Sequence, residues 1–155
     1  FRTYRHPLLL SGTATWQELA QLAPALTNKF SQINRVLYAL TAIEKFSVTF
    51  GTLSEDRVQR LQHADKLAMD FIYKNAPDRT VWQMPTVLLP LSANEAGKES
   101  IVLRPIMSEE AMTANFAELD LEKVKALAQE ILIDKNISAV FYDITNKPPA
   151  TIEWE

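Results

Sequence analysis

The chain has 155 residues, a length typical of one domain that can bury one hydrophobic core without disulfides. Sixteen Lys and Arg against nineteen Asp and Glu give a net charge of −3, which speaks against nucleic acid or an anionic membrane as the main partner. There is no cysteine, the two histidines lie far apart, and three glycines are too few for the glycine-rich loops that cradle phosphates. If the chain belongs to an enzyme, much of the chemistry must therefore lie elsewhere.

The N-terminus lacks the basic and apolar regions of a signal peptide, and the longest apolar runs have the length of a strand rather than of a membrane span. The first residue is Phe1 rather than Met, in the middle of a sequence pattern. We interpret the chain as a piece of a longer polypeptide.

The first half of the chain alternates strand and helix patterns. A run rich in apolar residues predicts a strand over 3–10, and Thr15 with Glu18 forms a capping box that starts a helix. Pro24 is expected to kink this helix, because proline lacks the amide hydrogen and clashes with the preceding turn. The remaining predicted elements are a strand over 35–41, a weaker strand over 46–50 and a helix from 54 to about 74.

The second half begins with two strand patterns that a polar loop over 92–99 joins as a hairpin. Ser108 is the expected N-cap of a short helix, and Asp120 is the N-cap of a longer helix with one apolar face. The predicted strands of this half are 86–91, 100–106 and 139–144.

An internal repeat links the two halves. Ile33-x-x-Val36-Leu37-Tyr38 recurs as Ile137-x-x-Val140-Phe141-Tyr142, and each copy follows an amphipathic helix that is itself preceded by a strand. The sequence therefore predicts an α+β fold, with two related strand–loop–helix–strand units, over 1–80 and 81–155, and helices that cover one face of a mixed sheet. Four residues of the first helix should then be buried like four of the last: Leu19, Leu22, Ala23 and Leu26 like Val124, Leu127, Ala128 and Ile131. The alternative is a chance likeness between two βαβ segments.

The last eleven residues form an unusual tail. Pro148 and Pro149 stiffen the backbone, and Ile152 and Trp154 offer apolar anchors. A stiff tail that carries one lysine and one glutamate suits a polar ligand, because lysine supplies a point charge for phosphate and glutamate accepts hydrogen bonds. The alternative is a tail that packs on the core with its charges in water.

The tail also resembles a known family. Tyr142-Asp143-Ile144-Thr145-x-Lys147-Pro148-Pro149-Ala150-Thr151-Ile152-Glu153-Trp154-Glu155 is similar to the C-terminus of glutamine-hydrolysing GMP synthetases. Matching landmarks span the chain, at Arg2-Thr3-Tyr4, Ile33-Asn34-Arg35-Val36-x-Tyr38, Gln83-Met84-Pro85 and Val102-Leu103-Arg104, followed by Met112-Thr113. Roughly ninety residues separate the first landmark from the last two, which resembles the longer type of the family, whose C-terminal domain holds two related subdomains.

This resemblance implies a cytoplasmic, three-part enzyme of which the chain is the last part. One domain frees ammonia from glutamine, a second uses ATP and Mg²⁺ to adenylylate XMP, and ammonia then displaces AMP to give GMP. The C-terminal domain closes the XMP site and mediates homodimer contacts, without nucleic acid or membrane as partner. No cofactor, catalytic residue or metal ligand is expected within the chain itself.

Matched position by position, the resemblance implies five XMP contacts: Arg2, Gln83, Lys147, Ile152 and Glu153. Arginine and lysine suit the 5′-phosphate, and the amide of Gln83 suits phosphate or ribose. Ile152 is expected against the purine or ribose, and Glu153 is expected to accept from ribose hydroxyls or a ring N–H.

The second copy of the repeat departs from the family pattern. The family usually has arginine where this chain has Ala139, while the first copy keeps Arg35. The alternative function is therefore a dimerisation or interaction module with the same fold and no bound nucleotide.

Overall fold

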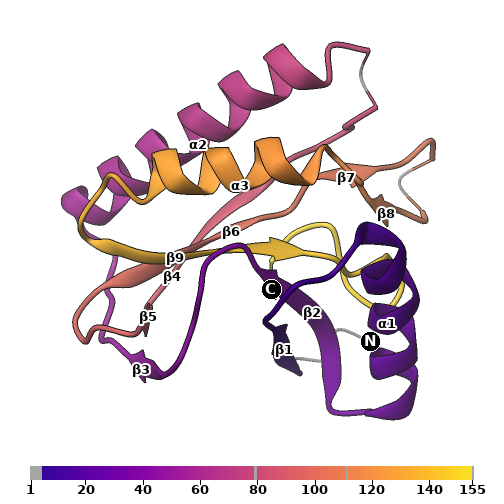
Figure 1. The fold of residues 1–155 in the computed structure, drawn as a ribbon, viewed down its shortest axis with the longest axis horizontal. Coiled ribbons are helices and arrows are strands. Elements are labelled where there is room, and N and C mark those ends of the chain that lie inside the picture. The colour runs from indigo at the N-terminus through magenta and orange to yellow at the C-terminus, as the bar shows by residue number, and fades with distance from the viewer. Residues whose placement is uncertain (1–4, 79, 111, 155) are drawn as a thin grey trace.

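The computed structural model describes residues 5–78, 80–110 and 112–154. Within these residues, a five-stranded mixed sheet has the strand order β1-β2-β9-β6-β4, and three helices accompany it (Figure 1). The sheet strands are β1 (His6–Leu10), β2 (Ile33–Ala39), β9 (Ile137–Asp143), β6 (Glu99–Leu103) and β4 (Thr86–Leu89). The helices are α1 (Trp16–Lys29), α2 (Glu55–Asn75) and α3 (Leu121–Ile131). The predicted α+β class is confirmed.

Two short strand pairs complete the fold. β3 (Phe46–Val48) pairs antiparallel with β5 (Leu91–Ala93), and β7 (Ile106–Met107) pairs antiparallel with β8 (Asn115–Phe116). The predicted strands over 86–91 and 100–106 are each divided, because their ends leave the main sheet to join these pairs. The first residues of the predicted hairpin loop accordingly belong to β5. Of the predicted strand over 3–10, residues 3 and 4 lie outside the described residues.

Local sequence signals start the helices as expected. The capping box at the start of α1 is present in both directions, since Glu18 N donates to Thr15 Oγ1 and the Glu18 carboxylate accepts from Thr15 N. Ser54 caps α2 and Asp120 caps α3. The helix predicted at Ser108 is wrong: the described residues there are bends, and Ser108 Oγ donates to Thr113 O at 2.6 Å. The hydroxyl closes the connection between β7 and β8 instead of capping a helix.

The repeat is visible in the register of the sheet. β1 and β2 form a parallel pair, and α1 lies between them in the sequence. In the same way, β6 and β9 form a parallel pair, and α3 lies between them in the sequence. β2 then pairs antiparallel with β9. Tyr38 lies opposite Tyr142, and these are equivalent positions of the two sequence copies. Equivalent residues that face each other across an antiparallel pair place a pseudo-two-fold axis between them. The predicted relation between the two units is therefore confirmed.

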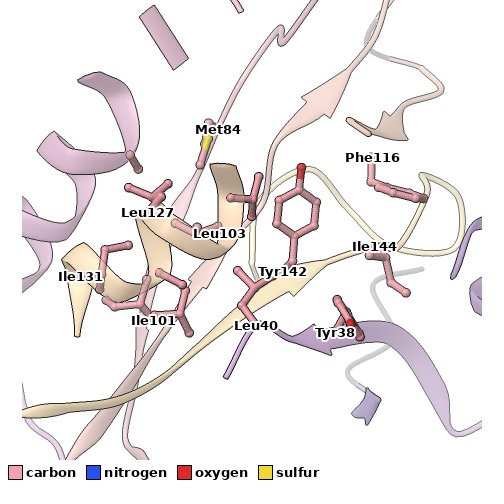
Figure 2. Close-up of a cluster of buried hydrophobic side chains, with 14 of the residues drawn as sticks. Tyr38, Leu40, Met84, Ile101, Leu103, Phe116, Leu127, Ile131, Tyr142 and Ile144 are labelled. Carbon is pink, nitrogen blue, oxygen red and sulfur yellow. The ribbon is translucent and has the colours of Figure 1, made fainter. Parts of the chain in front are cut away.

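Matching hydrogen bonds support this relation. The Tyr38 hydroxyl donates to Gly12 O at 2.7 Å, and the Tyr142 hydroxyl donates to Ala117 O at 2.5 Å, in each case to the strand-to-helix connection of its own unit. Gly12 has a φ of 117°, a conformation that a side chain would strain. Figure 2 shows both tyrosines in the core beside Leu40 and Ile144.

The helices differ in how much of their apolar face is covered. Leu19 and Ala23 of α1 are buried like the residues of α3, and Leu26 is partly buried. Leu22, however, is 42% exposed, whereas its counterpart Leu127 is 2% exposed, so the prediction for Leu22 is wrong. The reason is that α2 packs beside α3, whereas α1 lies at the other end of the sheet (Figure 1).

The sheet buries apolar side chains on both faces. The three helices cover a large cluster that includes Tyr38, Tyr142 and Leu127. On the other face, a smaller cluster around Phe141 and Val102 is covered by β5 and by Trp154 of the tail. Of the described residues, no helix is long and apolar enough to cross a membrane.

Candidate functional site

The described part of the tail, residues 145–154, is held on the sheet by three buried charged side chains. Arg35 comes from β2, Arg104 directly follows β6, and Asp143 is the last residue of β9. Their exposed fractions are 4%, 0% and 0%. Charges removed from water to this extent are stable only when they are paired and hydrogen-bonded, which sets a strict requirement on their surroundings.

Asp143 pairs with both arginines. Its Oδ2 lies 2.9 Å from Arg35 Nη1, and its Oδ1 lies 2.9 Å from Arg104 Nη1. Two further donors reach the same carboxylate: Trp154 Nε1 donates to Oδ2 at 2.8 Å, and Thr145 N donates to Oδ1 at 3.0 Å. Each carboxylate oxygen therefore accepts two hydrogen bonds.

The arginines use their remaining donors on the backbone of the tail. Arg104 donates to Ile152 O at 2.8 Å, to Thr151 O at 2.7 Å and to Thr145 O at 3.1 Å. The Nη2 of Arg35 donates to Thr151 Oγ1 at 3.0 Å and to Glu153 O. These bonds fix three successive residues, 151–153, by their main chain.

The aromatic ring of Trp154 packs against Arg35. The guanidinium carbon of Arg35 lies 4.9 Å from the centroid of the Trp154 ring, a distance at which a cation is attracted to an aromatic face. Burial lowers the pKa of the Arg104 guanidinium, and the neighbouring Asp143 carboxylate opposes this effect. Because arginine starts from so high a pKa, the Arg104 side chain stays charged at neutral pH.

Gln83 and Lys147 lie in the two outer members of a row of four short segments at the end of the sheet where β6 and β9 finish. Gln83 bridges to Ile106, Ile106 pairs with Phe116, and the adjacent Ala114 bridges to Lys147. Three strand spacings of about 4.8 Å separate the outer segments by about 14 Å. Asn146 adds a link, since its side chain accepts from Phe116 N at 3.2 Å.

The structure thus brings four of the five predicted contacts to one end of the sheet. Glu153 and Gln83 are exposed, and Lys147 and Ile152 are partly exposed. Arg2, the fifth, lies outside the described residues. These four side chains are therefore accessible or partly accessible, while the backbone of the tail is fixed.

A groove of about 550 Å³ opens beside this region and is lined by Met107, Ala114 and Asn115, among others. Its wall also includes Glu109 and Glu110. Two carboxylates disfavour a phosphate in the groove itself, so a phosphate is better placed on the side of Lys147.

The sequence reasoning gave no role to Arg35, Arg104 or Asp143, although all three stand within the landmarks of the resemblance. A signal was present, because Arg104 and Asp143 each come directly after three apolar or aromatic residues of a strand. A charged residue at the end of such a fully buried strand indicates an ion pair in the interior.

Ala139 is fully buried in the smaller cluster, where Ala93 of β5 packs over the sheet. It precedes Asp143 by four residues, about 13 Å along the strand. The departure from the family pattern is therefore accommodated by β5 and leaves the contacts of Asp143 intact.

Comparison with known proteins gives a consistent result. The family described as GMP synthase C terminal domain matches residues 70–154. A probable glutamine-hydrolysing GMP synthase of Leptospira interrogans is 38% identical over 159 residues, which covers 99% of this chain and 26% of the relative. The GMP synthases of Corynebacterium glutamicum and Bifidobacterium longum are 37% and 38% identical, and each match covers 68% of this chain. The chain spans about a quarter of the length of these relatives.

Proposed function

The chain belongs to the GMP synthase C-terminal domain family, and on this premise we propose that it closes the XMP site of a glutamine-hydrolysing GMP synthase. The reaction of the whole enzyme would be the ATP-dependent amination of XMP to GMP with ammonia from glutamine. ATP and Mg²⁺ would be held by domains that precede this chain. The part of this chain would be to bind and enclose XMP.

The observation that carries the proposal is the way in which the tail is held. Arg35 and Arg104 bind the carbonyl groups of residues 151–153, and this leaves the side chain of Glu153 exposed and that of Ile152 partly exposed. These main-chain bonds satisfy the buried cations without covering the two side chains. A fixed main chain with accessible side chains suits the recognition of a small polar ligand.

Each side chain has a proposed role. Lys147 and Arg2 would bind the 5′-phosphate by charge, and Gln83 would bind phosphate or ribose. Glu153 would accept hydrogen bonds from the ribose hydroxyls or from a ring N–H, and Ile152 would lie against the purine or ribose. A neighbouring domain would supply the opposite wall of the site.

The test is the substitution Lys147→Ala in the full-length enzyme, measured as GMP formation from XMP, ATP and ammonia. A charge-assisted hydrogen bond is worth roughly 1.5–3 kcal/mol, so the KM for XMP should rise about 10- to 100-fold. Lys135→Ala is the matched control, because Lys135 is an exposed lysine that precedes β9 whereas Lys147 follows it. The control should leave the KM for XMP unchanged.

An unchanged KM and turnover in Lys147→Ala would show that this lysine does not bind XMP. The same result with Gln83→Ala and Glu153→Ala would favour the alternative, a dimerisation or interaction module that binds no nucleotide.

A further inference from the structure

One set of contacts between the two halves of the chain holds the tail. Arg35 belongs to the first unit, whereas Asp143 and the tail belong to the second. The bond from Arg35 to Asp143 joins residues 108 positions apart, and its bonds to Thr151 and Glu153 join residues 116 and 118 positions apart. The first unit therefore supplies a side chain that holds the tail of the second.

We propose that Arg35 and Arg104 are positioning residues for XMP binding, which act by fixing the main chain of residues 151–153. This inference rests on the proposed function and assigns to it two side chains that would not touch the nucleotide. Arg104 holds the carbonyls of Thr151 and Ile152, and Arg35 holds Glu153 O and the hydroxyl of Thr151. Their shared partner Asp143 keeps both guanidinium groups in place.

The geometry explains why arginine is needed at both positions. Each guanidinium group binds one oxygen of Asp143 with one arm and the tail with another. A lysine has the same charge but only one nitrogen, so it can keep the ion pair while losing most of the bonds to the tail. Arg35→Lys therefore keeps the positive charge at this position and removes most of its hydrogen bonds to the tail.

A second network on the same sheet provides a matched control. Glu99 at the start of β6 also accepts from two arginines, Arg57 at 2.7 Å and Arg60 at 2.5 Å. It lies at the opposite end of β6 from Arg104, and its two arginines come from α2. Arg60→Lys makes the same chemical change in a two-arginine network that does not touch the tail.

The experiment compares Arg35→Lys, Thr151→Val and Arg60→Lys in the full-length enzyme. Thr151→Val removes the hydroxyl that Arg35 binds, at an exposed position where the change does not threaten folding. Two measurements are made: the hydrogen exchange of the peptide over 144–154, and the steady-state kinetics that give the KM and kcat for XMP with ammonia as the nitrogen donor.

We expect faster hydrogen exchange of the tail in both Arg35→Lys and Thr151→Val. In Arg35→Lys, the KM for XMP should also rise about tenfold, with a smaller change in kcat. The KM for ATP should not change. Arg60→Lys should alter neither the exchange of the tail nor the KM for XMP. A merely structural role for Arg35 would lower the amount of active enzyme and hence kcat, and would leave the KM for XMP as it was.

Two outcomes would overturn the proposal while the proposed function stands. In the first, Lys147→Ala raises the KM for XMP but Arg35→Lys and Thr151→Val do not. In the second, the exchange of the tail is unchanged in both variants. If Lys147→Ala itself leaves the KM unchanged, the proposed function fails, and the positioning role fails with it.

Discussion

At the scale of single residues, the stability of the sheet end depends on the ion pairs of Asp143. It is fully buried between two guanidinium groups, and it also accepts from the indole of Trp154. Removal of its charge would leave two buried cations next to each other without a carboxylate. The penalty for uncompensated buried charge is far larger than the gain from an exposed ion pair.

We therefore expect Asp143→Asn to lower the free energy of unfolding of the 155-residue chain by about 3–5 kcal/mol, measured by chemical denaturation. Asp70→Asn is the control, because Asp70 pairs with Lys66 on the exposed surface of α2. Its loss should cost less than about 1 kcal/mol. Equal effects of the two substitutions would mean that the Asp143 network contributes no more than a surface pair.

The candidate site shows which residues a sequence can reveal. Lys147, Ile152 and Glu153 are predicted contacts because the tail resembles the C-terminus of a known family, and their role stays a prediction. Arg35 was not given a role, because its partners lie more than 100 positions away and only the sheet brings them together. Contacts between distant segments leave no pattern of spacing in a single sequence.

At the scale of elements, α1 and α3 occupy equivalent positions in the two units, but their apolar faces are buried to different extents. α2 packs beside α3 and covers Leu127, whereas Leu22 at the matching position of α1 is 42% exposed. One turn away on the same helix, Leu19 is 1% exposed. The two leucines of α1 thus provide a comparison within a single helix.

We predict that Leu19→Ala lowers the free energy of unfolding by about 2–5 kcal/mol, because it leaves a cavity in the main cluster. Leu22→Ala should cost less than about 1 kcal/mol, since alanine favours the helix and part of the leucine side chain is already in water. Thermal or urea denaturation of both variants measures the difference. Similar losses would indicate that Leu22 is covered in solution, for example by a second molecule.

The elements were predicted best where the signal is local. The capping box at Thr15 and the N-cap at Asp120 depend on residues within three positions of each other, and both are present. The Ser108 helix had the same kind of local signal and did not form, because the segment must connect β7 to β8. The strand over 86–91 was divided for a similar reason, since its last part pairs with β3.

At the scale of the whole molecule, the two units pair within one chain through β2 and β9. This pairing buries apolar surface that a single-unit protein would have to bury against a second copy. A partner that is part of the same chain is present at high effective concentration, so the association costs little. The placement of a domain boundary near residue 80 stays a prediction.

We expect the 155-residue chain to fold alone, to sediment as a monomer and to form no GMP from XMP, ATP and ammonia. The first two follow from the internal pairing of the units, and the third follows because the nucleotide-activating chemistry would lie in other domains. Analytical ultracentrifugation and an assay for GMP measure these outcomes. A stable dimer would show that the homodimer contact implied by the family is retained, and detectable GMP would contradict the assignment of catalysis to other domains.

The two units are related by a pseudo-two-fold axis, but the second face of the sheet is not filled symmetrically. The tail binds Arg35 on β2, while the matching position on β9, Ala139, is covered by β5. Two separate copies of one unit would each have a tail, and the two tails would bind at equivalent positions on the sheet. This chain has one tail, so the Arg35 position holds the tail, and the matching Ala139 position instead takes part in the packing of β5 on the sheet.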